Sequence, residues 1–217
     1  MKQFIVIGLG SFGISLAKTL YEMGNDVLVI DENEELVQSM TGLVTHAVQA
    51  NATDENVLKS LGVKNFDVAI VAIGSNMESS IMVTMLVKEM GVKYVVAKAH
   101  NELHARVLYK VGADRVVMPE KDMGIRVARN IFSSNLLELI EFSKEYSIAE
   151  ILPIEEWFHK TLRDINMREK YGLNVIAAKK LNDEIIVSPG PDYVVDEGDV
   201  LAVCGKNTDI KKFEIKM

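Results

Sequence analysis

Residues 6–15 read VIGLGSFGIS and place Gly8, Gly10 and Gly13 in a GxGxxG pattern directly after an apolar run. This pattern is typical of the turn between a strand and a helix in a dinucleotide-binding fold. Gly8 would permit the tight turn, Gly10 would let the backbone approach a phosphate, and Gly13 would allow close helix packing. The phosphates would lie at the helix N-terminus, where free N–H groups and the helix dipole favour negative charge.

Short β-rich runs recur along the first part of the chain, with helix-length segments between them. The runs are Gln3–Gly8, Asp26–Asp31, His46–Gln49, Asp67–Ile73, Tyr94–Lys98 and Arg115–Met118. Strands that are apolar throughout are typical of a parallel sheet covered by helices on both faces. The predicted fold is α/β, with a right-handed, doubly wound, Rossmann-like parallel sheet. Helix starts are predicted at Ser11, Asp54, Asn101 and Ser75, where Glu78 would complete a capping box.

The pattern changes after Pro119, where residues 120–143 read as one long or broken helix. Its apolar positions are Ile125, Ala128, Ile131, Phe132, Leu136, Leu139 and Ile140. Strand runs return from about Tyr146, at residues 147–154, 173–181, 184–190 and 199–205, with turn signals at 189–191 and 197–199. We therefore expect a domain over residues 1–142 that ends in a crossover helix, and a small α+β domain over residues 143–217.

Composition limits the possible partners and compartment. Lys and Arg number 24 against 31 Asp and Glu, a formal net charge of −7, which disfavours nucleic acid and membrane surfaces as partners. Cys204 is the single cysteine and cannot close an intramolecular disulfide. Apolar runs are shorter than the ~18 residues that cross a bilayer, and the N-terminus lacks the pattern of a signal peptide. The sequence predicts a cytoplasmic protein.

Polar residues follow the predicted strands at the expected binding edge. Asp31, 18 residues after Gly13, could accept hydrogen bonds from two ribose hydroxyls and would repel a 2′-phosphate, which disfavours NADP. Alternatively, Asp31 and Glu32 are a solvated turn and helix start. Asn51, Ala52 and Thr53 follow the third strand, where a base is expected, and Ile73 and Gly74 end the fourth strand near the phosphates. The alternative for these residues is ordinary loop and capping chemistry.

The residues that a catalyst would need are scarce. A dehydrogenase requires a group that moves a proton while hydride moves. His100 and His104 have i, i+4 spacing and could form half of a metal site, but without a third ligand we favour a surface or helix-start role. We predict that the chain is not an enzyme. The alternatives are a small NAD-dependent oxidoreductase and a cytosolic nucleotide or redox sensor.

Four stretches together carry a resemblance to a known family. Residues 6–31, 50–58, 112–128 and 160–180 resemble the cytosolic regulatory subunits of Ktr/Trk bacterial potassium-uptake systems, the Ktr type more closely. These contain an RCK (regulator of potassium conductance) domain followed by a C-terminal RCK subdomain. The resemblance implies a homodimer that assembles into a ring, commonly an octamer, under a membrane potassium-translocating subunit. The chain would then be peripheral to the inner face of the plasma membrane, and exchange of ATP for ADP, or NAD(H) in some relatives, would control the partner.

The resemblance also implies roles for individual residues. Gly8, Gly10 and Gly13 match the phosphate loop, together with Ser11 and Phe12. Asp31 and Glu32 match the ribose position. The base-side loop is matched by Asn51, Ala52 and Thr53, and the phosphate-side turn by Ile73 and Gly74. Lys98 matches a basic residue aimed at the phosphates. Glu120 matches an acidic residue that helps to hold Mg²⁺ or another divalent cation. Similar Ktr subunits often carry arginine where this chain has Ser11, so NAD(H) or AMP-like ligands remain alternatives to ATP and ADP.

The C-terminal part resembles subdomains that bind cyclic di-AMP across a dimer interface. The matching residues are Arg168, Asn174 and Pro189. Arginine suits a phosphodiester and asparagine suits a base edge. The alternative is helix solvation and turn chemistry. The apolar segment Ile125–Ile140 is predicted to be buried between subunits of an obligate dimer, because a large exposed apolar surface implies a partner.

Overall fold

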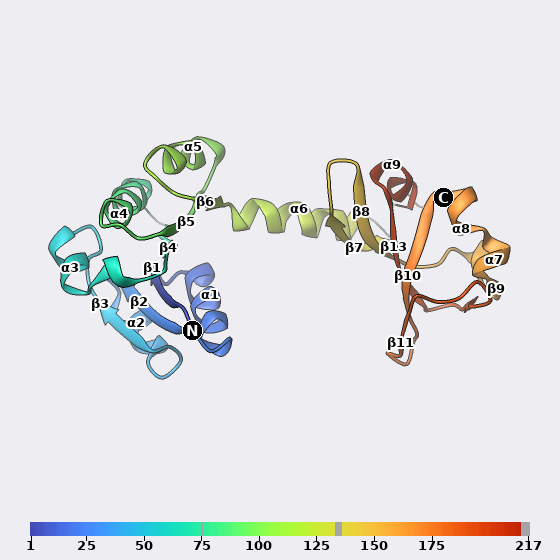
Figure 1. Ribbon diagram of the computed structural model, residues 1–217, viewed down its shortest axis with the longest axis horizontal. Helices are drawn as coiled ribbons and strands as arrows, with labels where there is room; N and C mark the ends of the chain where they lie inside the picture. The colour runs from blue at the N-terminus through green and yellow to red at the C-terminus, as the bar shows by residue number, and fades with distance from the viewer. Residues whose placement is uncertain (75, 133–135, 214–217) are drawn as a thin grey trace. The chain divides into compact units, whose positions relative to one another are not determined.

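The computed structural model describes residues 1–74, 76–132 and 136–213. The chain divides into two compact units, Met1–Asp122 and Met123–Met217, whose elements are labelled in Figure 1. The division falls within helix α6 (Pro119–Phe132). Each unit has its own hydrophobic core and is described separately below.

The first unit contains a six-stranded parallel sheet in the order β3-β2-β1-β4-β5-β6. The strands are β1 (Gln3–Ile7), β2 (Asp26–Asp31), β3 (His46–Gln49), β4 (Val68–Val71), β5 (Tyr94–Lys98) and β6 (Arg115–Val117). All six lie within two residues of their predicted bounds. The strand order reverses between β1 and β4, where a doubly wound sheet opens a crevice at the carboxyl ends of its strands.

Helices cover both faces of this sheet. They are α1 (Ser11–Glu22), α2 (Glu34–Met40), α3 (Glu55–Ser60), the 3-10 turn η1 (Val63–Asn65), α4 (Met77–Glu89) and α5 (Glu102–Lys110). Alternate residues of β1 enter different cores: Ile5 and Ile7 pack in one cluster with Leu58 and Val83, and Val6 packs in another. Burial on both faces explains why the central strands β1, β2 and β4 are mostly apolar.

Polar side chains cap most of these helices. Asn33, Asp54 and Asn101 each accept a hydrogen bond from a backbone N–H of the first turn. The predicted cap Ser75 lies outside the described residues, and the described cap of α4 is Asn76, which accepts from the Ser79 N–H. At α1 the cap position belongs to Gly10, and Ser11 is the first helical residue.

The second unit is an α+β domain built on a five-stranded antiparallel sheet in the order β11-β10-β13-β8-β7, beside a two-stranded sheet of β12 and β9. The strands are β7 (Leu136–Glu141), β8 (Tyr146–Ile151), β9 (Lys160–Thr161), β10 (Leu173–Lys179), β11 (Ile185–Val187), β12 (Val194–Val195) and β13 (Val200–Lys206). The helical segments are η2 (Glu155–Trp157), α7 (Leu162–Ile165), α8 (Met167–Tyr171), α9 (Asn207–Ile210) and η3 (Lys211–Phe213). Trp157 lies at the centre of the core and contacts the rings of Tyr171 and Phe213.

The predicted long helix after Pro119 is wrong in its second half. Helix α6 ends at Phe132, and Leu136, Leu139 and Ile140 belong to strand β7, which pairs with β8. Leu136 is buried and Leu139 packs against the core of the second unit, so tertiary pairing overrides the helical spacing of these residues. Strand β7 thus lies in the second sheet, and the predicted domain boundary between residues 142 and 143 stays a prediction.

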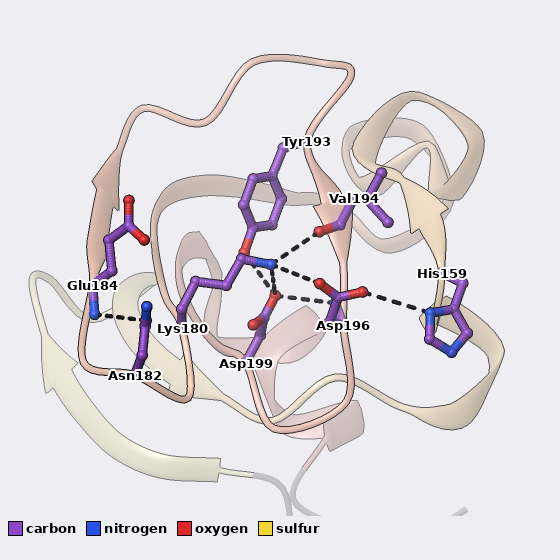
Figure 2. Close-up of polar contacts among 8 residues, drawn as sticks. All are labelled: His159, Lys180, Asn182, Glu184, Tyr193, Val194, Asp196 and Asp199. Carbon is purple, nitrogen blue, oxygen red and sulfur yellow. Dashed lines mark hydrogen bonds and ion pairs between the residues drawn. The ribbon is translucent and has the colours of Figure 1, made fainter.

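A polar cluster around buried Asp199 ties together the turns of the second unit (Figure 2). Lys180 Nζ lies 2.9 Å from Asp196 Oδ2 and 3.2 Å from Asp199 Oδ2, and the Tyr193 hydroxyl donates to Asp199 Oδ2 at 2.6 Å. Asp199 is 1% exposed. Burial and the bond to Asp199 raise the pKa of Tyr193 to about 12. Burial lowers the pKa of Lys180, but its hydrogen bonds outweigh this effect and raise the pKa above the ordinary value.

Among the described residues, every helix is too short or too polar to span a bilayer. The six-stranded parallel sheet followed by a small α+β domain confirms the predicted fold class.

Candidate functional site

A cavity of about 670 Å³ opens at the carboxyl edge of the first sheet. Its walls come from the ends of β1 to β5 and from the first turn of α6. The predicted site residues that line it are Gly8, Gly10, Phe12, Asp31, Glu32, Asn51, Ala52, Thr53, Ile73, Gly74, Lys98 and Glu120. Ser11 and Gly13 are not among its lining residues. The structure thus brings most of the predicted residues together, and their binding roles stay predictions.

The glycine turn has the geometry that each glycine was expected to require. Gly8 has φ +101°, and a Cβ there would lie 2.9 Å from the backbone of Ala72 on the neighbouring strand. A Cβ on Gly13 would lie 2.0 Å from the Gly8 carbonyl oxygen, so α1 can pack against the turn only with glycine at this position. At Gly10 a Cβ would have no described heavy atom within 4 Å, which leaves room for a ligand.

The N-terminus of α1 lies at this cavity and has neither a side-chain cap nor an acidic residue in its described first turn. The cap residue Gly10 has no side chain to accept from the free N–H groups, and the first turn, all of it described, contains no acidic residue. Helix α2, by contrast, has Asn33 as its cap and two glutamates in its first turn. An anion at the start of α1 would therefore find unpaired donors and a favourable field.

Asp31 has a structural contact in addition to its predicted role. Its Oδ2 accepts from the Leu9 N–H at 2.6 Å and its Oδ1 accepts from the Asn33 N–H at 2.8 Å. The carboxylate therefore joins the glycine turn, the end of β2 and the start of α2. Each oxygen can accept a further hydrogen bond, so the contact is compatible with a sugar hydroxyl as a second donor.

Asn51 forms a tight local turn on the opposite wall. Its Oδ1 accepts from the Thr53 N–H at 2.8 Å and from the Thr53 hydroxyl at 2.6 Å. Ala52 between them is 6% exposed. This is the loop chemistry of the alternative interpretation, and the turn still leaves the Asn51 Nδ2 donors unused.

Lys98 and Glu120 form an ion pair in the cavity. Lys98 Nζ lies 2.5 Å from Glu120 Oε1, and the hydrogen bond from Lys98 holds the pKa of Glu120 below its ordinary value. A Cβ on Gly74 would lie 3.5 Å from Lys98 Nζ, so the predicted phosphate-side turn adjoins the ammonium group.

His104 is buried rather than on the surface, contrary to one of the two roles predicted for it. It lies in the first turn of α5, is 0% exposed, and its Nδ1 accepts from the His100 N–H at 3.4 Å. Its Nε2 has no partner among the described residues. Burial, followed by the nearby His100, lowers the pKa of His104.

The structure does not support the half metal site at His100 and His104. In the part of the chain that the structure describes, no group of three or more His, Cys, Asp and Glu side chains could hold a metal ion. Glu120 therefore offers a cation one carboxylate from this chain, and other oxygen ligands would have to come from a bound phosphate or a second copy.

Some cavity residues were missed from the sequence. They are Leu9, Leu36, Asn76, Ser79 and His100, with apolar residues from the strand ends. Asn76 and His100 lie in the segments that connect the carboxyl ends of β4 and β5 to the next helices, so the rule that ligands bind at strand carboxyl ends could have identified them.

A second cavity, of about 410 Å³, lies in the second unit. Arg168 and Pro189 line it together, and Arg163 and Asn166 add polar groups that the sequence prediction missed. Asn174 is not among its lining residues. Its neighbours Leu173 and Val175 do line it, and successive strand residues point to opposite faces, so Asn174 points away.

Backbone hydrogen bonds position the proline loop of this second cavity. The Tyr193 N–H donates to the Gly190 carbonyl at 3.0 Å, and the N–H groups of Leu162 and Arg163 donate to Tyr193 and Pro191 at 3.0 and 2.9 Å. The Tyr193 side chain is in turn held by Asp199 in the polar cluster of Figure 2. The cavity wall is therefore anchored to the core of its unit.

A glycine turn and a cavity at the switch point of a doubly wound parallel sheet define the first unit as a Rossmann-like domain. Family models agree: the TrkA-N domain matches residues 4–119 and the TrkA-C domain matches residues 148–215. The chain belongs to the family of Ktr/Trk potassium-uptake regulatory subunits, as the resemblance predicted.

Curated relatives cover nearly the whole chain. The Ktr system potassium uptake protein A of Bacillus subtilis is 47% identical over 98% of this chain and 96% of its own length. The Ktr system potassium uptake protein A of Vibrio alginolyticus is 39% identical over 94% of this chain and 92% of its own length.

Solved structures share the fold at low sequence identity. The GsuK channel bound to NAD matches 99% of this chain with a TM-score of 0.68 and 18% identity. GsuK bound to ADP matches 62% of this chain with a TM-score of 0.54 and 17% identity. The chain spans 40% and 35% of these two channel chains.

Proposed function

We propose that this chain is a cytosolic nucleotide-sensing subunit of a potassium uptake system. It binds ATP or ADP in the cavity of its first unit and thereby controls a membrane potassium-translocating partner, without catalysing a reaction. The observation that carries the proposal is the cavity at the glycine turn, in a chain 47% identical to a Ktr system potassium uptake protein. The GsuK structures bound to NAD and to ADP support nucleotide binding by this fold.

The cavity suggests how a nucleotide would lie in it. Phosphates fit at the glycine turn and the uncapped start of α1, with Lys98 as a second source of positive charge. Asp31 would accept from ribose hydroxyls, and the Asn51–Thr53 turn would form the wall on the base side, since both line the cavity. Glu120 would contribute one oxygen ligand to Mg²⁺ or another divalent cation.

Control of a partner requires that the ligand prefer one state of the assembly over another. The third phosphate of ATP could supply this preference through charge contacts that ADP lacks. Ser11 cannot supply such a contact as arginine would, so NAD(H) remains the alternative ligand for this cavity.

Exposed apolar residues of α6 support the proposal that the chain assembles with further copies of itself. Met123, Ile125 and Val127 are 53%, 44% and 45% exposed, although all three are apolar. We propose that they pack against a second copy in a homodimer, and that dimers form a ring, as an octamer, under the membrane subunit. Met123 and Val127 are four residues apart and share one face of the helix, and exposed apolar side chains on one face are a common sign of such an interface.

Thermal unfolding with ATP, ADP, NAD or NADH, each with and without Mg²⁺, tests the ligand. A ligand that prefers the folded state stabilises by about 2.7 kcal/mol at a hundred times its Kd. We expect stabilisation by ATP and ADP, enhanced by Mg²⁺ for ATP. Stabilisation by NAD(H) alone would instead favour a redox-linked regulator, and no stabilisation by any of the four would overturn the proposal.

Co-purification tests the partner. We expect the tagged chain to retain a membrane potassium-transport subunit when the two are expressed together. A chain that binds nucleotide but never retains such a subunit would be a sensor unrelated to ion transport.

The second cavity supports a second ligand, cyclic di-AMP. Arg168 and Pro189 line it together, and Arg163 adds another guanidinium group suited to a phosphodiester. Asn174 lies on the other face of β10. It would therefore contact cyclic di-AMP only in a site formed with another copy of the chain. Isothermal titration with cyclic di-AMP should give binding that Arg168→Ala weakens at least tenfold. Absence of heat well above micromolar ligand would rule this ligand out.

A further inference from the structure

Lys98 is the one lysine or arginine among the described residues that line the first cavity, which also presents Asp31, Glu32 and Glu120. Its side chain is 10% exposed and extends from the end of β5. A polyphosphate that enters the described cavity therefore meets a single cationic side chain. The other favourable contacts are backbone N–H groups at the start of α1.

This cation already has a carboxylate partner. Lys98 Nζ donates to Glu120 Oε1 at 2.5 Å, and this is its only hydrogen bond to the described residues. The two side chains differ in burial, at 10% and 69% exposed. The lysine is therefore held in place, whereas the carboxylate lies at the rim and can turn to solvent.

A buried ammonium group needs an anion beside it. Removing Glu120 without a replacement would leave the Lys98 charge uncompensated in a poorly hydrated site, which is costly. A phosphate oxygen is an equivalent acceptor for a charge-assisted hydrogen bond. The predicted phosphate-side turn at Gly74 adjoins Lys98 Nζ, so a phosphate there would reach the same ammonium group.

We propose that Lys98 exchanges one anion for another: it pairs with Glu120 in the nucleotide-free protein and with a nucleotide phosphate in the bound protein. The exchange releases the Glu120 carboxylate, which then serves as an oxygen ligand for a divalent cation beside the phosphates. This inference rests on the proposed nucleotide site. It explains how one carboxylate, which cannot hold a metal ion alone, becomes useful to a cation only when phosphate oxygens are also present.

Thermodynamic linkage allows the exchange to be measured through cation binding and through nucleotide binding. A cation that binds better after nucleotide binding must strengthen nucleotide binding by the same factor. Without divalent cation, Glu120 competes with the nucleotide for Lys98. With divalent cation, the cation binds Glu120 and the competition is removed.

The test uses two substitutions in the full chain, with ADP and Mn²⁺ as probes. Glu120→Gln removes the competing charge, so ADP should bind three- to tenfold more tightly in EDTA and should no longer respond to Mn²⁺. Lys98→Met frees Glu120 but removes the phosphate contact. ADP should then bind at least tenfold more weakly, and the nucleotide-free protein should bind Mn²⁺ no more tightly than wild type, as measured by the electron paramagnetic resonance signal of free Mn²⁺, because freed Glu120 lacks the phosphate oxygens that complete the cation site.

The neighbouring ion pair of Lys121 and Glu102 provides a matched control. Both residues are exposed, and neither lines the cavity. Lys121→Met and Glu102→Gln should change neither ADP nor Mn²⁺ binding. If Lys98→Met does not fold, Glu120→Gln alone decides the test, because position 120 is largely exposed and the glutamine amide oxygen still accepts a hydrogen bond from Lys98.

Two outcomes would overturn the exchange, and they can be told apart. If wild type binds ADP but Glu120→Gln binds it equally or more weakly in EDTA, the exchange is wrong and the nucleotide site stands. If wild type binds no nucleotide in titrations of ATP, ADP and NAD(H), the proposed function fails and the exchange fails with it.

Discussion

At the scale of single residues, Gly10 and Gly13 lie in one turn but differ in what surrounds them. A methyl group on Gly13 would overlap the Gly8 carbonyl oxygen, whereas one on Gly10 would point into open space. Gly10 also has φ −66° and ψ 175°, which alanine adopts without strain. We therefore propose that the first glycine of this pair matters for binding, whereas the second is required for folding.

Substitution of each by alanine should separate these roles. Gly13→Ala should lower the free energy of unfolding by about 3 kcal/mol because the turn and α1 must move apart. Gly10→Ala should change it by less than about 1 kcal/mol and should weaken ADP binding, since the methyl group occupies the space where a phosphate would approach. Urea unfolding and ADP titration measure both effects. Equal destabilisation by the two variants would contradict this account of the turn.

His104 should make the first unit sensitive to mild acid. Burial is the main reason why the pKa of His104 in the folded protein is lower than the ordinary value of 6.5. At a pH between these two pKa values, His104 is protonated in the unfolded chain but neutral in the folded chain. The stability contribution of neutral His104 is therefore present above pH 6.5 and is lost as the pH falls. We expect the free energy of unfolding of His104→Leu to depend less on pH between 7.5 and 5.5 than that of wild type.

The exposed His46 provides the control for this prediction. His46→Gln should retain the full pH dependence of wild type. If the two variants have the same pH dependence, the titration belongs to another group.

At the scale of elements, strand β7 shows where an apolar pattern has two interpretations. The stretch LLELIE at residues 136–141 fits the spacing of a helix that continues α6, and it also fits a half-buried strand. Pairing with β8, which lies further along the chain, decides for the strand. No local signal contains this information, because it comes from a partner element.

Substitutions at Leu136 and Ile140 can test the assignment of residues 136–141 to a strand, because the two side chains differ in burial. Leu136 is 2% exposed and Ile140 is 58% exposed, whereas both would lie on the apolar face of the predicted helix. Leu136→Ala should destabilise the second unit by about 2 to 5 kcal/mol and Ile140→Ala by less than about 1 kcal/mol. Fluorescence of Trp157, the single tryptophan of the chain and part of this core, reports the unfolding. Similar losses in both variants would argue against the strand.

The parallel sheet was far easier to predict than β7. Its central strands β1, β2 and β4 are short, mostly apolar runs buried on both faces, and each is preceded by a polar residue. The glycine turn could also be predicted from the sequence, because a side chain at Gly8 or Gly13 would collide with neighbouring backbone atoms. The Lys98–Glu120 pair was not predicted because the two residues are 22 positions apart and meet only when β5 and α6 are in place. The burial of His104 depends in the same way on packing around α5.

At the scale of the whole molecule, the question is what covers the apolar side chains of α6. We expect light scattering at micromolar concentration to give a dimer or a larger assembly. Ile125→Asp replaces one exposed apolar side chain of α6 by a charge and should weaken association at least tenfold if this side chain is buried between copies, because burial of an unpaired carboxylate is costly. Leu181→Asp is the control, since Leu181 is equally apolar and 83% exposed but lies outside α6. A monodisperse wild-type monomer would contradict the proposed dimer.

The hydrogen bond from the Leu9 N–H to Asp31 has a consequence for how cofactor preference can change in this family. The carboxylate suited to a ribose also holds the backbone of the turn suited to phosphates. A substitution that admits a 2′-phosphate by removing this charge would also release the turn. Specificity engineering at position 31 therefore needs a compensating acceptor for the Leu9 N–H, such as the carbonyl of asparagine, before the new cofactor can bind to an intact loop.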